Sequence, residues 1–186
     1  MKMKLVLLLA VITSFASCIS IQFKTPASYR YDKLSPTDQA KVIFNEAQCC
    51  SKKNEHLVYA VNAAQVKQCL REHDKSVVYR WAPHCHGVHC LPLSTFVNAC
   101  LQKGYHPIIV AEYTAIEDIE NMNNTDYTVY TMDHRYYQKK KTTKCLKPFQ
   151  FELTGQKKSK ENIGARYLVF SKEKFTHFLV DLNTLK

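Results

Sequence analysis

Two cysteines and three histidines lie close together in the stretch from Val77 to Pro92, and they are the best candidates for chemistry in this chain. They are Cys85, Cys90, His84, His86 and His89. A thiolate is both a nucleophile and a metal ligand, and a protonated histidine nearby favours the thiolate over the thiol. Cysteine and histidine together also suit zinc or copper. The pattern therefore indicates either thiol exchange or a mixed sulfur and imidazole metal site.

A predicted strand and a predicted helix would position these residues. Val77 to Trp81 has the β-branched and aromatic character of a strand buried in a sheet. A helix can begin at Leu91-Pro92, because proline at a first helical position loses no hydrogen bond that was available. We expect the exposed N–H groups and the dipole at a helix start to favour the thiolate form of Cys85.

The run Trp81-Ala82-Pro83-His84-Cys85 resembles the strand-end motif of the thioredoxin superfamily, in which Trp-Ala-x-Trp precedes the nucleophilic cysteine. His84 stands where the second tryptophan is usual. Four residues separate Cys85 from Cys90, whereas the superfamily normally has two. The Q-class peroxiredoxins also have four, but they carry Thr or Ser three residues before the peroxidatic cysteine, where this chain has Ala82. The Sco copper chaperones are thioredoxin-like too, and they pair two close cysteines with a distant histidine.

The resemblance implies an α/β fold, a thioredoxin-like three-layer sandwich in which a central mixed sheet has helices on both faces. It implies thiol-disulfide exchange with protein thiols or disulfides, in which Cys85 attacks and Cys90 resolves the mixed disulfide. Gly87 would loosen the segment between the two cysteines enough for them to bridge. The residues that would bind substrate or tune the cysteine pKa are Trp81, Pro83, His84, His86 and Ala165.

Ala165 marks a departure from the superfamily pattern. Thioredoxin-like oxidoreductases place a cis-proline against the cysteine pair, just before the strand that corresponds to residues 166 to 170. Ala165 occupies that place here. A cis bond before a residue other than proline costs about 3 kcal/mol, so we expect a trans bond and a different docking surface.

Two other interpretations of the cysteine pair stay open at this point. In the first, zinc or copper is held by Cys85 and Cys90 together with two of the three histidines His84, His86 and His89. In the second, the two cysteines form an inert disulfide, or remain thiols, in a thioredoxin-like domain that only binds a partner. The redox interpretation requires no cofactor.

Residues 1 to 18 have the pattern of a secretory signal peptide. Lys2 and Lys4 form its charged start, and Leu5 to Ile12 is an apolar run too short to span a bilayer unaided. The end of the segment, Phe15-Ala16-Ser17-Cys18, is similar to a bacterial lipobox in which Cys18 is lipidated. The alternative is ordinary cleavage after a small residue. We expect an exported protein in the bacterial cell envelope, anchored by lipid on the periplasmic side, with 19 to 34 as a tether.

The remaining composition predicts one domain over 35 to 186. The chain has 186 residues, of which 46% are hydrophobic, enough for one ordinary core. Its formal charge of +10 falls to +8 once Lys2 and Lys4 are removed with the signal. Much of the excess lies in a basic segment over about 133 to 162, which we interpret as an irregular, solvated insertion. No nucleic-acid motif accompanies it.

Helical and strand periodicities alternate along the domain. Ser35-Pro36 predicts a helix start, and an apolar stripe continues this helix to Cys50. Short connections imply right-handed crossovers and a parallel sheet covered on both faces, closed by an antiparallel hairpin. The further predicted helices cover 62 to 73, the segment after Cys90 up to Gly104, and 115 to 122; the strands cover 57 to 61, 77 to 81, 107 to 113, 127 to 132, 166 to 170 and 176 to 182.

For the other cysteines the sequence predicts structural positions rather than chemistry. Cys50, Cys69 and Cys100 lie on apolar helix faces and are expected in the core, whereas Cys49 is not. Cys145 lies in the basic segment and is expected to be exposed or paired. Without Cys18 the count is seven, so at least one cysteine is unpaired in a monomer.

Overall fold

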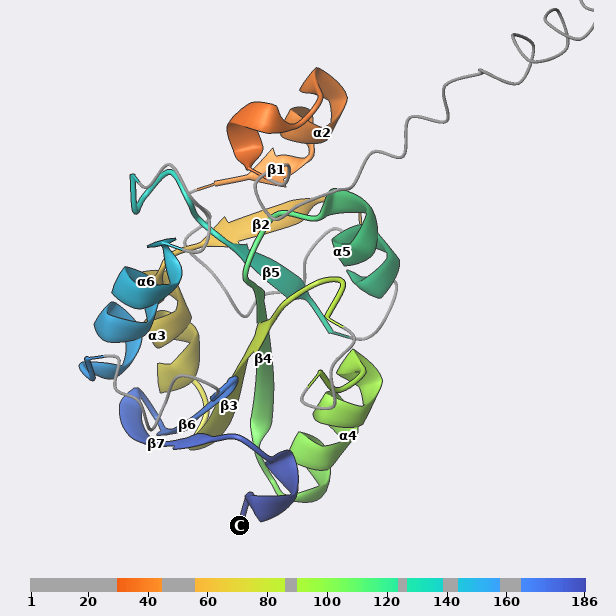
Figure 1. Ribbon diagram of the computed structural model, residues 1–186. Helices are drawn as coiled ribbons and strands as arrows, with labels where there is room; N and C mark the ends of the chain where they lie inside the picture. Colours follow the sequence, from red (N-terminus) through yellow and green to blue (C-terminus); the bar gives the residue numbers. More distant parts are fainter. Residues whose placement is uncertain (1–29, 45–55, 86–89, 124–126, 139–143, 158–164) are drawn as a thin grey trace, which may run out of the picture.

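The computed structural model describes residues 30–44, 56–85, 90–123, 127–138, 144–157 and 165–186, and these form a sheet with helices on both faces (Figure 1). Seven strands join in the order β1-β2-β5-β4-β3-β6-β7. The strands are β1 Val42–Ile43, β2 Val58–Val61, β3 Lys75–Trp81, β4 His106–Ala111, β5 Val129–Met132, β6 Tyr167–Ser171 and β7 Lys174–Leu179. The helices are α2 Pro36–Ala40, α3 Ala63–Arg71, α4 Leu93–Gln102, α5 Ile116–Asn123 and α6 Leu146–Thr154, with 3-10 turns η2 Tyr31–Lys33 and η4 Leu182–Thr184.

The sheet is mixed, and β3 is an interior strand between β4 and β6. The pairs from β1 through β3 are parallel, whereas β6 runs antiparallel to both β3 and β7. The prediction of a mixed α/β fold closed by an antiparallel hairpin is therefore confirmed. Glycine is absent from the hairpin turn, and Lys172 adopts the positive φ of 50° there.

Strand order differs from the simplest expectation for such a chain. Consecutive strands usually lie side by side, which would put β2 next to β3. Instead β5 and β4 lie between β2 and β3. The residues at the carboxyl ends of five parallel strands therefore meet along one edge of the sheet, and strands distant in sequence contribute to it.

Local sequence signals account for most helix ends. The Ser35 side chain accepts a hydrogen bond from the backbone N–H of Asp38 at the start of α2. Asn62 and Gln65 form a capping box at the start of α3. After α4, Gly104 adopts a φ of 73°, the left-handed conformation that glycine tolerates best.

The predicted helix from Ser35 to Cys50 is wrong in its length. The helix α2 ends at Ala40, and Val42–Ile43 forms the edge strand β1, which pairs in parallel with β2. The predicted apolar stripe contains Ile43, and Ile43 and its neighbour Val42 are both β-branched. Their pairing with β2 overrides the short periodic signal. Cys49 and Cys50 lie outside the described residues.

The basic segment is more ordered than its composition suggested. It contains α6, whose Phe149 and Leu153 are buried against the sheet with Tyr137. Cys145 at the start of this helix is fully buried, so the prediction that it is exposed is wrong. Lysines dominate the composition of this segment, and they hide the helical spacing of its apolar residues. These apolar residues pack α6 beside α3.

Two apolar layers cover the two faces of the sheet. Tyr79 of β3, Phe96 of α4 and Tyr167 of β6 pack together on one face, with Tyr79 and Tyr167 ring centroids 4.8 Å apart. On the other face α3 and α6 bury Leu70 and Phe149. No helix within the described ranges has the length and apolar character needed to cross a membrane. Because β3 is packed between these two layers, the residues that follow it are held in a fixed position.

Candidate active site

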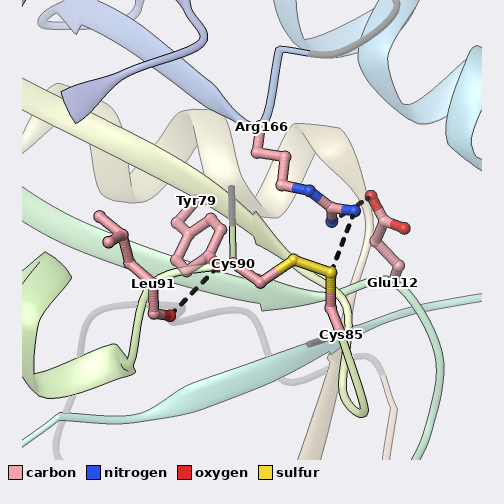
Figure 2. Close-up of a disulfide and its surroundings, with 6 residues drawn as sticks. All are labelled: Tyr79, Cys85, Cys90, Leu91, Glu112 and Arg166. Atoms are coloured by element: carbon pink, nitrogen blue, oxygen red, sulfur yellow. Dashed lines mark hydrogen bonds and ion pairs between the residues drawn. A yellow bond between two sulfur atoms is a disulfide. The ribbon is translucent and has the colours of Figure 1, made fainter. Parts of the chain in front are cut away.

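A disulfide joins Cys85 to Cys90 beyond the carboxyl end of β3 (Figure 2). The two Cα atoms are 5.8 Å apart, an ordinary separation for a disulfide. Cys85 ends a tight turn, in which its backbone N–H donates to the carbonyl of Ala82. The sequence therefore placed this pair correctly, at the end of a central strand.

An arginine approaches one of the two sulfur atoms. Arg166 Nη2 lies 3.6 Å from Cys85 Sγ, and Arg166 Nη1 lies 3.9 Å from Glu112 Oε1 (Figure 2). The side chains of Arg166 and Glu112 are only 25% and 16% exposed, so water screens their charges incompletely. A guanidinium at this distance stabilises a thiolate at Cys85 when the disulfide is reduced.

The sheet brings Arg166 and Glu112 to the sulfur from two different strands. Arg166 immediately precedes β6, and its carbonyl accepts a hydrogen bond from the backbone N–H of Arg80 on β3. Glu112 immediately follows β4, and its backbone N–H donates to the carbonyl of Trp81. Neither residue was predicted from the sequence. The available signal was the pairing of their strands with β3, since such neighbours end close to Cys85.

A second arginine is buried beneath this group. Arg80 is 6% exposed and donates to the Gln150 side chain of α6 at 2.8 Å and to the carbonyl of Ala165. Burial lowers the pKa of Arg80, and Arg166 lowers it further, whereas Glu112 raises it. The carbonyl of Ala165 thus anchors a buried cation, and this alanine is itself 1% exposed.

The expected helix start does not lie at Cys85. The helix α4 begins at Leu93, with Pro92 as its N-cap, beyond both cysteines. Because the effect of a helix dipole falls off within the first turn, the expectation that it acts on Cys85 is wrong. The positive charge beside Cys85 Sγ comes instead from Arg166.

An open groove of about 770 Å³ adjoins the disulfide. Both cysteines line it, and its wall is mainly apolar. The apolar residues that form most of this wall are Trp81, Leu91, Val97, Ile109, Met122 and Val129. An apolar groove that includes a reactive group is a common form of binding site, and it fits the apolar side chains of a partner molecule.

His84 lies at one side of the same groove. Its backbone has a φ of 63°, and its Nε2 lies 3.2 Å from Asp118 Oδ2 on α5. Trp81 also lines the groove, whereas Pro83 is buried beneath the turn. His86 and His89, on which the metal interpretation of this segment depends, lie outside the described residues, as does Cys18.

Two further cysteines of the described residues match the prediction for core positions. Cys69 and Cys100 are 2% and 0% exposed. Burial raises the pKa of the Cys100 thiol to about 12, which makes it unreactive. Cys69 takes part in a disulfide.

Comparisons with protein-family models, with curated proteins and with solved structures each found no match.

Proposed function

We propose that this chain is an exported, thioredoxin-like protein that exchanges thiols and disulfides through Cys85 and Cys90. The observation that carries the proposal is the position of Arg166, whose guanidinium lies 3.6 Å from one sulfur of a disulfide that opens onto a groove. A purely structural disulfide gains nothing from a neighbouring cation, because neither of its sulfurs carries charge. A redox pair does gain, because its reduced form contains a thiolate.

The proposed exchange runs in two steps. In the reduced protein, the Cys85 thiolate attacks one sulfur of a partner disulfide, a mixed disulfide forms, and the other partner sulfur leaves as a thiolate that takes up a proton. Cys90, once deprotonated, then attacks Cys85 Sγ, which forms the Cys85–Cys90 bond and releases the second partner thiol. The partner gains two electrons and the protein loses two. The reverse sequence oxidises a dithiol partner.

The geometry distinguishes the roles of the two cysteines. Arg166 contacts Cys85 Sγ, so the positive charge favours Cys85 as the thiolate that attacks first and leaves last. The groove beside it has the apolar character that suits a cysteine-containing protein segment. We therefore propose protein thiols or disulfides as partners.

The thioredoxin-like assignment rests on the mixed sheet, the disulfide after central strand β3, and the closing hairpin β6–β7. The insertion of β5 between β2 and β4 and the buried Ala165 are specific to this chain. Export, with a lipid anchor at Cys18, is proposed from the N-terminal sequence alone. An oxidising compartment is consistent with the disulfides.

Replacement of the resolving cysteine tests the proposal. Cys90→Ser should trap mixed disulfides between Cys85 and partner proteins, detected on non-reducing gels and mapped by mass spectrometry. Cys85→Ser is the matched control and should trap none. Unmodified protein, equilibrated in graded glutathione buffers and alkylated, should show a reversible Cys85–Cys90 bond. A bond that never opens across the glutathione range, or equal trapping by both variants, would refute the exchange function.

A further inference from the structure

A second sulfur site lies at the opposite end of β3. Cys69, His73 and His106 each offer one ligand atom, and these atoms lie within 4.8 Å of one another. Cys69 is buried, and the two histidines are half-buried. This cluster shares no residue with the groove or with the Cys85–Cys90 pair.

Secondary structure brings the three residues together. Cys69 lies in the last turn of α3, and His73 follows two residues after this helix ends at Arg71. His106 begins β4, where it pairs in register with Ser76 of β3. The imidazole rings of His73 and His106 stack with centroids 3.5 Å apart and planes 8° from parallel. The two rings place two potential nitrogen ligands beside one sulfur. Because each nitrogen lone pair lies in the plane of its ring, one ring must turn out of the stack before both nitrogens can face the same ion.

We propose that reduction of the Cys69 disulfide converts this cluster into a binding site for a divalent metal ion of the zinc type. In the oxidised protein, the sulfur is bonded to another sulfur and cannot act as a thiolate ligand. A dithiol reductant transfers two electrons to that disulfide, leaves two cysteine thiols, and is itself oxidised to a disulfide. Metal binding then displaces the thiol proton of Cys69 into solvent.

The ligand set fits zinc. Two imidazoles and one thiolate are a mixed set that zinc accepts, and a water molecule would complete four-fold coordination. Tetrahedral zinc places such ligand atoms about 3.5 Å apart, so the cluster must contract by about 1 Å. His73 lies in the connection after α3 has ended, where the backbone can make this adjustment, while the sheet holds His106. The inference is independent of the proposed exchange function.

Metal titration of a variant that lacks the exchange pair tests the inference. The full chain with Cys85→Ser and Cys90→Ser is reduced with dithiothreitol, desalted anaerobically and titrated with Co²⁺ or Zn²⁺. Co²⁺ should give the absorption bands of tetrahedral sulfur coordination at one equivalent, and Zn²⁺ should displace it. The same protein kept oxidised should bind neither ion at this site.

Single substitutions assign the ligands. In the same background, His73→Ala, His106→Ala and Cys69→Ser should each weaken Zn²⁺ binding about 100-fold, measured against a chromophoric chelator. His177→Ala, which removes an exposed histidine of β7, is the matched control and should leave affinity unchanged. Thermal unfolding without metal shows whether each variant is folded, and His73→Ala, in a surface connection, is the mildest. No binding by the reduced protein, equal binding by the oxidised protein, or unchanged affinity in His73→Ala would overturn the inference.

Discussion

The two ends of β3 hold sulfur in opposite electrostatic surroundings. At the carboxyl end, Cys85 Sγ lies beside the Arg166 guanidinium, with Glu112 and the buried Arg80 close behind. At the amino end, Cys69 lies beside the stacked rings of His73 and His106. Charge favours a reactive thiolate at the first end, whereas the imidazole rings at the second end are potential nitrogen ligands for a metal.

The difference shows how one sheet can support two kinds of sulfur chemistry. Residues that follow the parallel strands meet at one edge, together with Arg166 before the antiparallel strand β6, and residues that precede the parallel strands meet at the other edge. A buried cation needs anchoring acceptors, and these come from Gln150 and the carbonyl of Ala165.

The largest effect should come from removing the acceptor that Gln150 gives to Arg80. Gln150→Leu leaves a buried guanidinium without its side-chain partner and should lower the free energy of unfolding by about 3 kcal/mol. Urea denaturation of the oxidised protein measures this loss. Gln156→Leu, at an exposed position after α6, is the control and should change stability by less than about 0.5 kcal/mol. A loss below about 1 kcal/mol for Gln150→Leu would mean that the stability of the protein does not depend on the hydrogen bond between Arg80 and Gln150.

Sequence reasoning succeeded where a signal is local. The strand before Cys85, the caps Ser35 and Asn62, and the stop at Gly104 each depend on neighbours within a few residues, and all four are present. It failed where distant segments compete. Val42–Ile43 joins the edge of the sheet instead of extending a helix. Its partner strand β2 lies farther along the chain than the residues whose periodicity predicted the helix.

The candidate site divides in the same way. Cys85 and Cys90 stand in one recognisable stretch, and the resemblance to the thioredoxin superfamily implied that they could bridge although four residues separate them. Arg166 and Glu112 are separated from Cys85 by other elements and reach it only through strand pairing. Without the order of the strands, no spacing rule could bring them together. A helix start is the nearest source of positive charge that the sequence around Cys85 indicates, and the prediction that it acts on Cys85 is wrong.

A smaller effect should come from a buried histidine at the carboxyl end of the strands, when the protein is exposed to acid. His134 follows β5 at the carboxyl edge, and burial chiefly, with help from Arg30, lowers its pKa to about 4, although a hydrogen bond to the Glu112 backbone raises it. The unfolded chain binds a proton near pH 6.5, whereas the folded chain does so only near pH 4. Between these values the unfolded state holds more protons, so stability falls as pH falls. Burial and His73 also lower the pKa of His106 at the amino end to about 4, so the contribution of His134 must be isolated by substitution.

Urea denaturation at pH 7 and pH 4.5 checks this sign. The loss of stability attributable to His134 should be on the order of 2 kcal/mol. His134→Gln should remove that part of the pH dependence, whereas His177→Gln, at an exposed position, should retain it. Equal pH dependence in both variants would show that burial at the carboxyl edge does not disfavour the protonated form of His134.

The smallest effect bears most directly on the comparison. Arg166→Gln removes the cation beside Cys85 Sγ and should destabilise the Cys85 thiolate by about 1.4 kcal/mol, a factor of about ten. In reduced protein at pH 6, alkylation of Cys85 by iodoacetamide should slow about tenfold, as mapped by mass spectrometry. Arg166→Lys, which keeps the charge but not the planar donor, should fall between the two.

Arg71→Gln is the matched control, because it removes an exposed arginine paired with Glu173 far from the disulfide. This control should leave Cys85 alkylation unchanged, and Arg166→Gln should not alter Zn²⁺ affinity at Cys69, His73 and His106. If Arg166→Gln alkylates as fast as the parent protein, the cation does not set the reactivity of Cys85. The carboxyl end would then differ from the amino end in shape alone, and the groove would have to account for any preference for Cys85 over Cys90.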